Sequence, residues 1–176
     1  MAAILIVPGL HDSGPAHWQT WFEHTLGDTL RVNQADWEGP CLPEWAARVG
    51  EVIAAQNESV WVVAHSFGCL AAVCAGFVCP SRIRAALLVA PADPDRFGLA
   101  ALLPQERLIF PSMIVASNND PWVKAGVAEH WARVWGSSYR NIGDAGHINV
   151  ESGHGPWPQG LAFFEELRRV ALAAQL

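Results

Sequence analysis

Short, unbroken apolar runs alternate along the chain with longer segments in which apolar residues recur every three or four positions. The first short run, residues 3–7, shows no alternation of apolar and polar residues, which is typical of a strand covered on both faces. The pattern predicts strands over residues 3–7, 30–33, 59–64, 83–90, 113–116 and 138–142. It predicts helices over residues 17–26, 43–56, 67–79, 121–135 and 159–173.

Predicted strands and helices thus follow one another along the whole chain, with no repeat and no linker between them. This succession predicts an α/β fold with a predominantly parallel, six-stranded sheet and helices on both of its faces. We expect residues 1–176 to form one domain. The helix over residues 67–79 is apolar all round, so we expect it to be buried against the sheet.

Composition narrows the class of protein. Of the 176 residues, 51% are hydrophobic and 16% are charged, as in a globular domain with a proper core. The formal net charge of −6 argues against nucleic acid or an anionic membrane as a partner. The apolar start is too short for a secretory signal, and no run of about 18 apolar residues could span a membrane. We therefore expect a cytoplasmic protein.

The segment with the clearest chemical signal is residues 60–69, V-W-V-V-A-H-S-F-G-C. A strand-like run leads into Ser66, and a helix is predicted directly after it. A tight strand–turn–helix of this kind lifts a serine hydroxyl clear of the sheet and requires small residues two positions before and after the serine. Gly68 meets that requirement, and Ala64 is a mild departure from the glycine of the G-x-S-x-G pattern.

Ligands of open parallel sheets bind beyond the carboxyl ends of the strands. The loops that follow the predicted strands contain residues able to perform chemistry. These residues are His11, Asp12, Asp36, Ser66, Asp93, Asp120 and His147.

A serine hydroxyl is a weak nucleophile, so it needs a base, and the base needs a carboxylate that fixes its tautomer. Ser66, Asp120 and His147 follow strands in the order Ser…Asp…His, which is that of α/β-hydrolases. His154 is the main alternative for the base, and Asp93 is the alternative for the acid. A plain helix N-cap is the alternative role for Asp120, and the two roles are compatible.

The remaining site residues follow from the same geometry. The backbone N–H groups of Phe67 and Leu10 are expected to form the oxyanion hole. Further candidates for contact with the substrate are His11 and three tryptophans, although His11 could serve only the turn and each tryptophan could simply close the core. The three tryptophans are Trp18, Trp122 and Trp157.

Several motifs together resemble the small α/β-hydrolase family of serine hydrolases related to retinoblastoma-binding protein 9 and bacterial YdeN. They are V-P-G-L-H-D-S-G-P-A-H-W at 7–18, V-A-H-S-F-G-C at 63–69, N-D-P-W at 119–122, G-H-I-N at 146–149 and S-G-H-G-P-W-P-Q-G at 152–160. The resemblance implies an α/β-hydrolase fold without a large cap domain, with Ser66 as nucleophile, Asp120 as acid and His147 as base. The family's L-x-C-x-E motif is absent, which argues against a retinoblastoma-type partner.

The sequence therefore predicts a serine hydrolase that cleaves small esters, with amides as a further option, through an acyl-enzyme and without a cofactor. The expected partner is a small-molecule substrate. One alternative is a catalytically idle binding module on a hydrolase scaffold. Another is a metal hydrolase using His11, Asp12 and His17, but these lack the i, i+4 spacing of a helical ligand pair, so we expect no metal.

Overall fold

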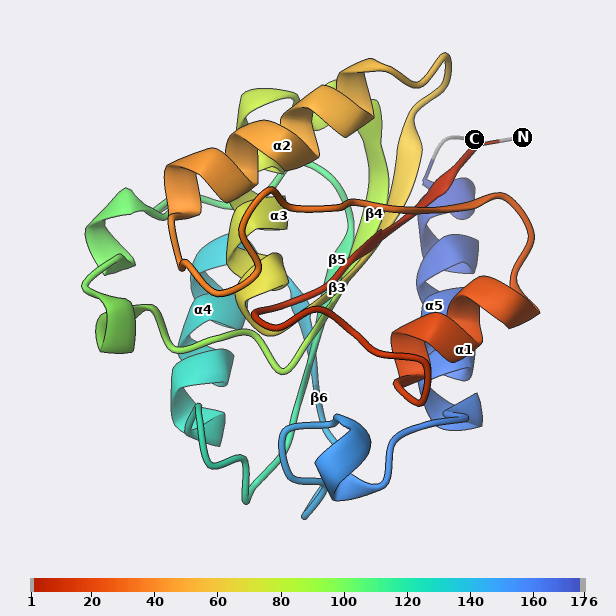
Figure 1. Ribbon diagram of the computed structural model, residues 1–176. Helices are drawn as coiled ribbons and strands as arrows, with labels where there is room; N and C mark the ends of the chain where they lie inside the picture. The colour runs from red at the N-terminus through yellow and green to blue at the C-terminus, as the bar shows by residue number, and fades with distance from the viewer. Residues whose placement is uncertain (1, 175–176) are drawn as a thin grey trace.

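The computed structural model describes residues 2–174, and its centre is a six-stranded sheet (Figure 1). The strands are β1 (Ile4–Val7), β2 (Thr29–Arg31), β3 (Val60–His65), β4 (Ile83–Val89), β5 (Ser112–Ala116) and β6 (Ser138–Asn141). They lie in the order β2-β1-β3-β4-β5-β6, and every neighbouring pair is parallel. The predicted α/β class with a parallel sheet is thereby confirmed.

Five α-helices cover the two faces of this sheet. They are α1 (Trp18–Thr25), α2 (Leu42–Ala54), α3 (Phe67–Val78), α4 (Ala125–Trp135) and α5 (Pro158–Ala173). Helices α2, α3 and α4 pack on one face, and α1 and α5 pack on the other (Figure 1). Within residues 2–174, no helix is both long enough and apolar enough to cross a membrane, and no large cap domain covers the sheet.

The central strands are apolar on both faces because each face has its own core. Successive side chains of a strand point to opposite faces. Accordingly, Leu5 and Val7 of β1 pack in the cluster under α2, α3 and α4, whereas Ile4 and Ile6 pack under α1 and α5. The unbroken apolar run predicted this two-sided burial, and the structure confirms it.

The structure differs from the sequence-based prediction mainly in the connections. The segment between β4 and β5 contains two short 3₁₀ helices, η2 (Pro94–Phe97) and η3 (Ala100–Leu102), and η4 (Val150–Ser152) follows β6. The helix predicted from residue 121 begins only at Ala125. The reason is a turn before it, in which Asp120 Oδ1 accepts hydrogen bonds from the backbone N–H groups of Trp122 (2.8 Å) and Val123 (3.3 Å).

Candidate active site

Ser66 lies on a strained turn between β3 and α3. Its backbone has φ +54° and ψ −124°, a combination that non-glycine residues rarely adopt and that is concentrated at functional sites. The turn brings α3 against the end of β1, and a Cβ atom on Gly68 would overlap the backbone oxygens of Val7 and Pro8. A Cβ on Gly9 would lie 2.9 Å from Cβ of Ser66. The small residues thus let the nucleophile turn and the loop after β1 meet.

The structure brings Ser66, His147 and Asp120 into one chain of hydrogen bonds. Oγ of Ser66 lies 2.9 Å from Nε2 of His147, and Nδ1 of His147 lies 2.8 Å from Oδ2 of Asp120. The side chain of His147 is 10% exposed and that of Asp120 is 1% exposed. With its proton on Nδ1, His147 donates to the carboxylate and accepts from the serine, the arrangement that general-base activation requires.

Asp120 contributes both of its carboxylate oxygens. Oδ2 meets His147, while Oδ1 accepts from the turn that follows it. The sequence left open whether Asp120 caps a turn or contacts the base, and it does both.

The two alternative residues are engaged elsewhere. Oδ1 of Asp93 accepts from the N–H of Asp95 at the start of η2 (3.1 Å), although Asp93 lines the same pocket. Nδ1 of His154 lies 3.0 Å from Oγ of Ser152. Neither residue is hydrogen-bonded to Ser66 or His147 within residues 2–174.

Two backbone N–H groups beside Ser66 are free to donate. Phe67 is the first residue of α3, so its N–H has no partner within the helix. Leu10 lines the pocket from the loop after β1, and no group within residues 2–174 accepts its N–H. Both positions agree with the oxyanion hole expected from the sequence.

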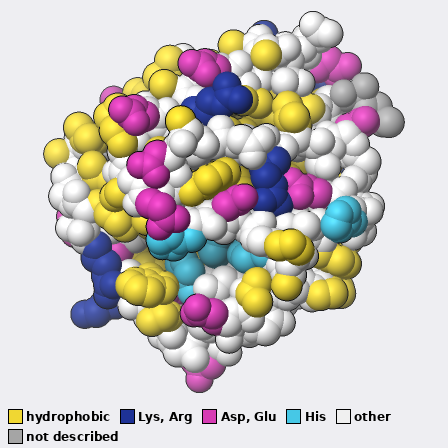
Figure 2. All heavy atoms as spheres, in the orientation of Figure 1, with side chains coloured by type: hydrophobic (Ala, Val, Ile, Leu, Met, Phe, Trp, Pro, Cys, Tyr) yellow, Lys and Arg dark blue, Asp and Glu magenta, His cyan; other side chains and the backbone are white. Residues whose placement is uncertain are grey.

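The hydroxyl of Ser66 opens into a pocket of about 490 Å³ at the carboxyl edge of the sheet. Figure 2 shows histidine side chains gathered in a hollow on this face of the molecule. Apart from His65, which is the last residue of β3, the other lining residues come from the connections that follow the strands. They are Leu10, His11, Asp12, Gly14, His17, His65, Ala92, Asp93, Arg96, Phe97, Trp122, His147, Asn149, Val150 and Glu151.

Of the four proposed substrate contacts, two line the pocket. Trp122 is 56% exposed, at a rim where the Arg96 guanidinium lies 5.8 Å from its ring centre. His11 also lines the pocket, where its Nδ1 lies 2.6 Å from the Glu38 carboxylate.

The expectation for Trp18 and Trp157 is wrong. Trp18 is 0% and Trp157 5% exposed, and neither lines the pocket. Their rings pack edge to face at 5.1 Å, in the core beneath α1 and α5. A flat, largely apolar indole gains most from being buried in a core, and sequence position alone could not distinguish that role from a place on the pocket wall.

Two histidines in the pocket wall are held neutral. Burial lowers the pKa of His17 to about 4, and electrostatic interactions with Arg31, His147 and His154 act in the same direction. Burial also lowers the pKa of His65 well below its usual value, with His147 and His17 adding to the effect. At neutral pH both imidazoles therefore act as hydrogen-bonding groups without charge.

The three residues considered as metal ligands have separate partners. His11 meets Glu38, Asp12 pairs with Arg31 at 2.9 Å, and Nδ1 of His17 accepts from the N–H of Gln19 at 3.1 Å. Within residues 2–174, no group of three or more His, Cys, Asp or Glu side chains is placed to hold a metal ion.

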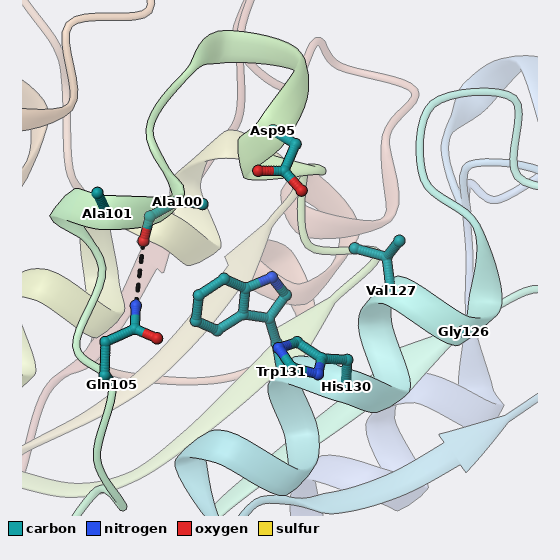
Figure 3. A pocket seen from close by; sticks show the side chains of 8 residues that line it. All are labelled: Asp95, Ala100, Ala101, Gln105, Gly126, Val127, His130 and Trp131. Carbon is teal, nitrogen blue, oxygen red and sulfur yellow. Dashed lines mark hydrogen bonds between the residues drawn. The ribbon is translucent and has the colours of Figure 1, made fainter.

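A second, more open hollow of about 710 Å³ lies between η2, η3 and the start of α4 (Figure 3). Its floor is the Trp131 indole, and Gln105 beside it donates to the backbone oxygen of Ala100. Among the described residues, no Ser, Thr, Cys or Lys lines this hollow, so it offers no hydroxyl, thiol or amine nucleophile. The smaller pocket at Ser66 is the candidate active site.

Some residues that support the site were missed by the sequence analysis. The side chains of Ser117 and Asn119 bond the backbone of the loop that carries His147. Gln19 is fully buried, and its amide nitrogen donates to the carbonyl oxygens of Val7 and Val63. The polar run at 117–120 directly after a predicted strand was an available signal for the first two. Nothing in the sequence distinguishes Gln19 from an exposed helix residue.

Comparison with known proteins identifies the family. The model of the serine hydrolase family matches residues 4–166, whereas no curated protein sequence matches the chain. Among solved structures, the chain is similar to a putative YdeN-like hydrolase from Pectobacterium atrosepticum, with 34% identity, a TM-score of 0.92, and coverage of 97% of this chain and 92% of that one.

Two more distant structures share the fold. The ydeN gene product of B. subtilis has 18% identity and a TM-score of 0.78, over 95% of this chain and 98% of that one. The monoacylglycerol lipase of Paleococcus ferrophilus has 12% identity and a TM-score of 0.72, over 94% of this chain and 93% of that one. The family match spans most of the sequence, and the chain belongs to the serine hydrolase family.

Proposed function

We propose that this hydrolase is a carboxylesterase that cleaves small esters through a Ser66–His147–Asp120 triad and an acyl-enzyme. The observation that carries the proposal is the pair of hydrogen bonds at His147, 2.9 Å to Ser66 and 2.8 Å to Asp120. These distances are those of a nucleophile and base ready for proton transfer.

In the proposed reaction, Oγ of Ser66 attacks the ester carbonyl while Nε2 of His147 takes the hydroxyl proton. The Asp120 carboxylate stabilises the imidazolium, and the N–H groups of Phe67 and Leu10 stabilise the oxyanion. His147 returns the proton to the leaving alcohol. A water molecule, deprotonated by His147, then releases the acid and restores Ser66.

The pocket supports a small substrate with an apolar acyl group. Its volume of about 490 Å³ lies in the range of sites for small molecules. Phe97, Trp122 and Val150 supply apolar surface around the serine, and Trp122 and Val150 are 56% and 48% exposed at the rim. We expect esters of short to medium acyl chains to be better substrates than long ones.

The test combines turnover with covalent labelling. Wild-type protein should hydrolyse 4-nitrophenyl esters and should be labelled by a fluorophosphonate, whereas Ser66→Ala should lose labelling and at least about a thousandfold in kcat. Ser59→Ala is the matched control, because Ser59 directly precedes β3 at the end away from Ser66 and its hydroxyl bonds Ser81. Wild-type turnover by Ser66→Ala would refute the triad, and an unlabelled, inactive wild type would indicate an idle binding module.

A further inference from the structure

The loop that presents His147 is held through four consecutive residues. Each of residues 145–148 has a backbone N–H or C=O group bonded by a side chain from another part of the chain. The bonds join Ala145 N to Ser117 Oγ (2.9 Å), Gly146 N to Asn119 Oδ1 (2.7 Å), His65 Nε2 to His147 O (2.9 Å) and Trp18 Nε1 to Ile148 O (2.9 Å).

This loop needs external support because its backbone has positive φ on both sides of His147, and one of those positions is a β-branched residue. Gly146 has φ +58°, and Ile148 has φ +48°. A β-branched residue with positive φ is an outlier that persists only where its surroundings enforce it. Ile148 is 0% exposed and packs in the core beneath α1 and α5, so packing and hydrogen bonds together impose the conformation.

Among the four supporting side chains, only His65 bonds the backbone of His147 itself. A carbonyl oxygen can only accept, so His65 carries its proton on Nε2 and donates it. The ring cannot turn away easily, since it is 5% exposed and packs edge-on against His17 at 4.9 Å and Trp18 at 5.9 Å.

The bond links the strand end that precedes Ser66 to the loop that carries His147. His65 is the last residue of β3 and directly precedes Ser66, and its side chain reaches a carbonyl 82 residues further along the chain. The same strand end therefore presents the nucleophile and holds the base. If the carbonyl of His147 moved, its imidazole would leave hydrogen-bonding distance of Ser66 Oγ.

We propose that His65 is a positioning residue, which fixes the catalytic base by donating from Nε2 to the His147 carbonyl. The proposal rests on the triad proposed above. Because a displacement of about 1 Å in a catalytic group can cost about a hundredfold in rate, removing this donor lowers kcat. The substitution leaves KM nearly unchanged, since Phe97, Trp122 and Val150, which supply the apolar surface around the serine, are not altered.

The decisive comparison is between His65→Met, which removes the donor, and His65→Gln, whose amide nitrogen can take the place of Nε2. We expect His65→Met to lower kcat about tenfold to a hundredfold with KM within about twofold, and His65→Gln to restore most of the rate. His130→Met on the exposed face of α4 is the control. Rates are divided by the number of sites titrated with fluorophosphonate, so that an unfolded fraction does not count.

A double-mutant cycle tests whether His65 acts through the base. In a His147→Ala background, His65→Met should have no further effect on the residual rate, because no imidazole remains to be positioned. A second measurement needs no substitution at His65. ¹⁵N NMR of wild-type protein should show His65 as the neutral Nε2–H tautomer from pH 5 to 8.

Several results would overturn the proposal while leaving the triad intact. These are full kcat in His65→Met, no recovery in His65→Gln, a rise in KM alone, an equal loss in the His147→Ala background, or an Nδ1–H tautomer. If wild-type protein is neither active nor labelled at Ser66, the triad itself fails and the positioning role falls with it.

Discussion

His17 should make the folded protein sensitive to mild acid. Its side chain is 5% exposed, and its pKa falls from 6.5 to about 4 on folding, chiefly through burial. As the pH drops below 6.5, the unfolded chain binds a proton at this position but the folded chain does not. The stability contributed by the neutral imidazole is therefore complete above pH 6.5 and is lost as the pH falls toward 4.

The size of the effect follows from the two pKa values. A difference of about 2.5 pKa units corresponds to about 3.4 kcal/mol once both states are protonated. At pH 5 the same linkage makes the free energy of unfolding about 2 kcal/mol lower than at pH 7.5. Other titrating groups contribute to the total pH dependence, so the test must isolate this one.

The variant His17→Asn isolates the contribution of His17 to the pH dependence of stability. Nδ1 of His17 accepts from the N–H of Gln19 and caps α1, and asparagine is a preferred N-cap whose Oδ1 can accept the same bond. Urea unfolding is followed by tryptophan fluorescence at pH 7.5 and at pH 5. Between these two pH values, the free energy of unfolding should fall by about 2 kcal/mol more in wild-type protein than in the variant. Equal losses in the two proteins would refute the reasoning.

Two further predictions concern the acid and the nucleophile turn. Asp120→Asn should lower kcat about a thousandfold to ten-thousandfold in an ester assay, because the amide favours the wrong tautomer of His147. The control Asp93→Asn should keep a kcat near that of wild type. A large loss of kcat in Asp93→Asn would contradict the assignment of Asp120 as the acid of the triad. Gly68→Ala should lower the free energy of unfolding by about 1–3 kcal/mol, since its Cβ would overlap the backbone of Val7 and Pro8. The control is Gly50→Ala in α2, where an added Cβ would meet no atom within 4 Å apart from its own helix backbone and chain neighbours. It should stabilise the protein by about 0.5–1 kcal/mol. Equal effects of the two substitutions in urea unfolding would exclude the close approach as the cause.

The order and type of the main elements were predictable because each depends on local pattern. An apolar run such as residues 3–7 can be satisfied only where both faces are covered, and β1 lies inside the sheet. Element ends were less predictable where side chains intervene. The start of α4 moved to Ala125 because the Asp120 carboxylate bonds the turn before it, a competition that apolar periodicity does not register.

The candidate site was predictable in its residue types and only partly in its geometry. The strand-end rule placed Ser66, Asp120 and His147 at one edge, and the structure places them within hydrogen-bonding distance. The same rule gave no basis for separating Trp122, which lines the rim, from Trp157, which is buried. Both lie in loops beyond strands, and which way an indole turns is set by neighbours distant in sequence.

By itself, the sequence determined the parallel α/β architecture, the strained turn at Ser66 and the set of residues able to act there, since these depend on local spacing and on the chemistry of each side chain. Only the tertiary structure decided which carboxylate meets His147, which aromatic rings reach the pocket, and that His65 holds the base. The physical reason is that these contacts join residues up to 82 positions apart. Their geometry is fixed by the packing of the whole sheet and its helices, which no local segment of the chain specifies.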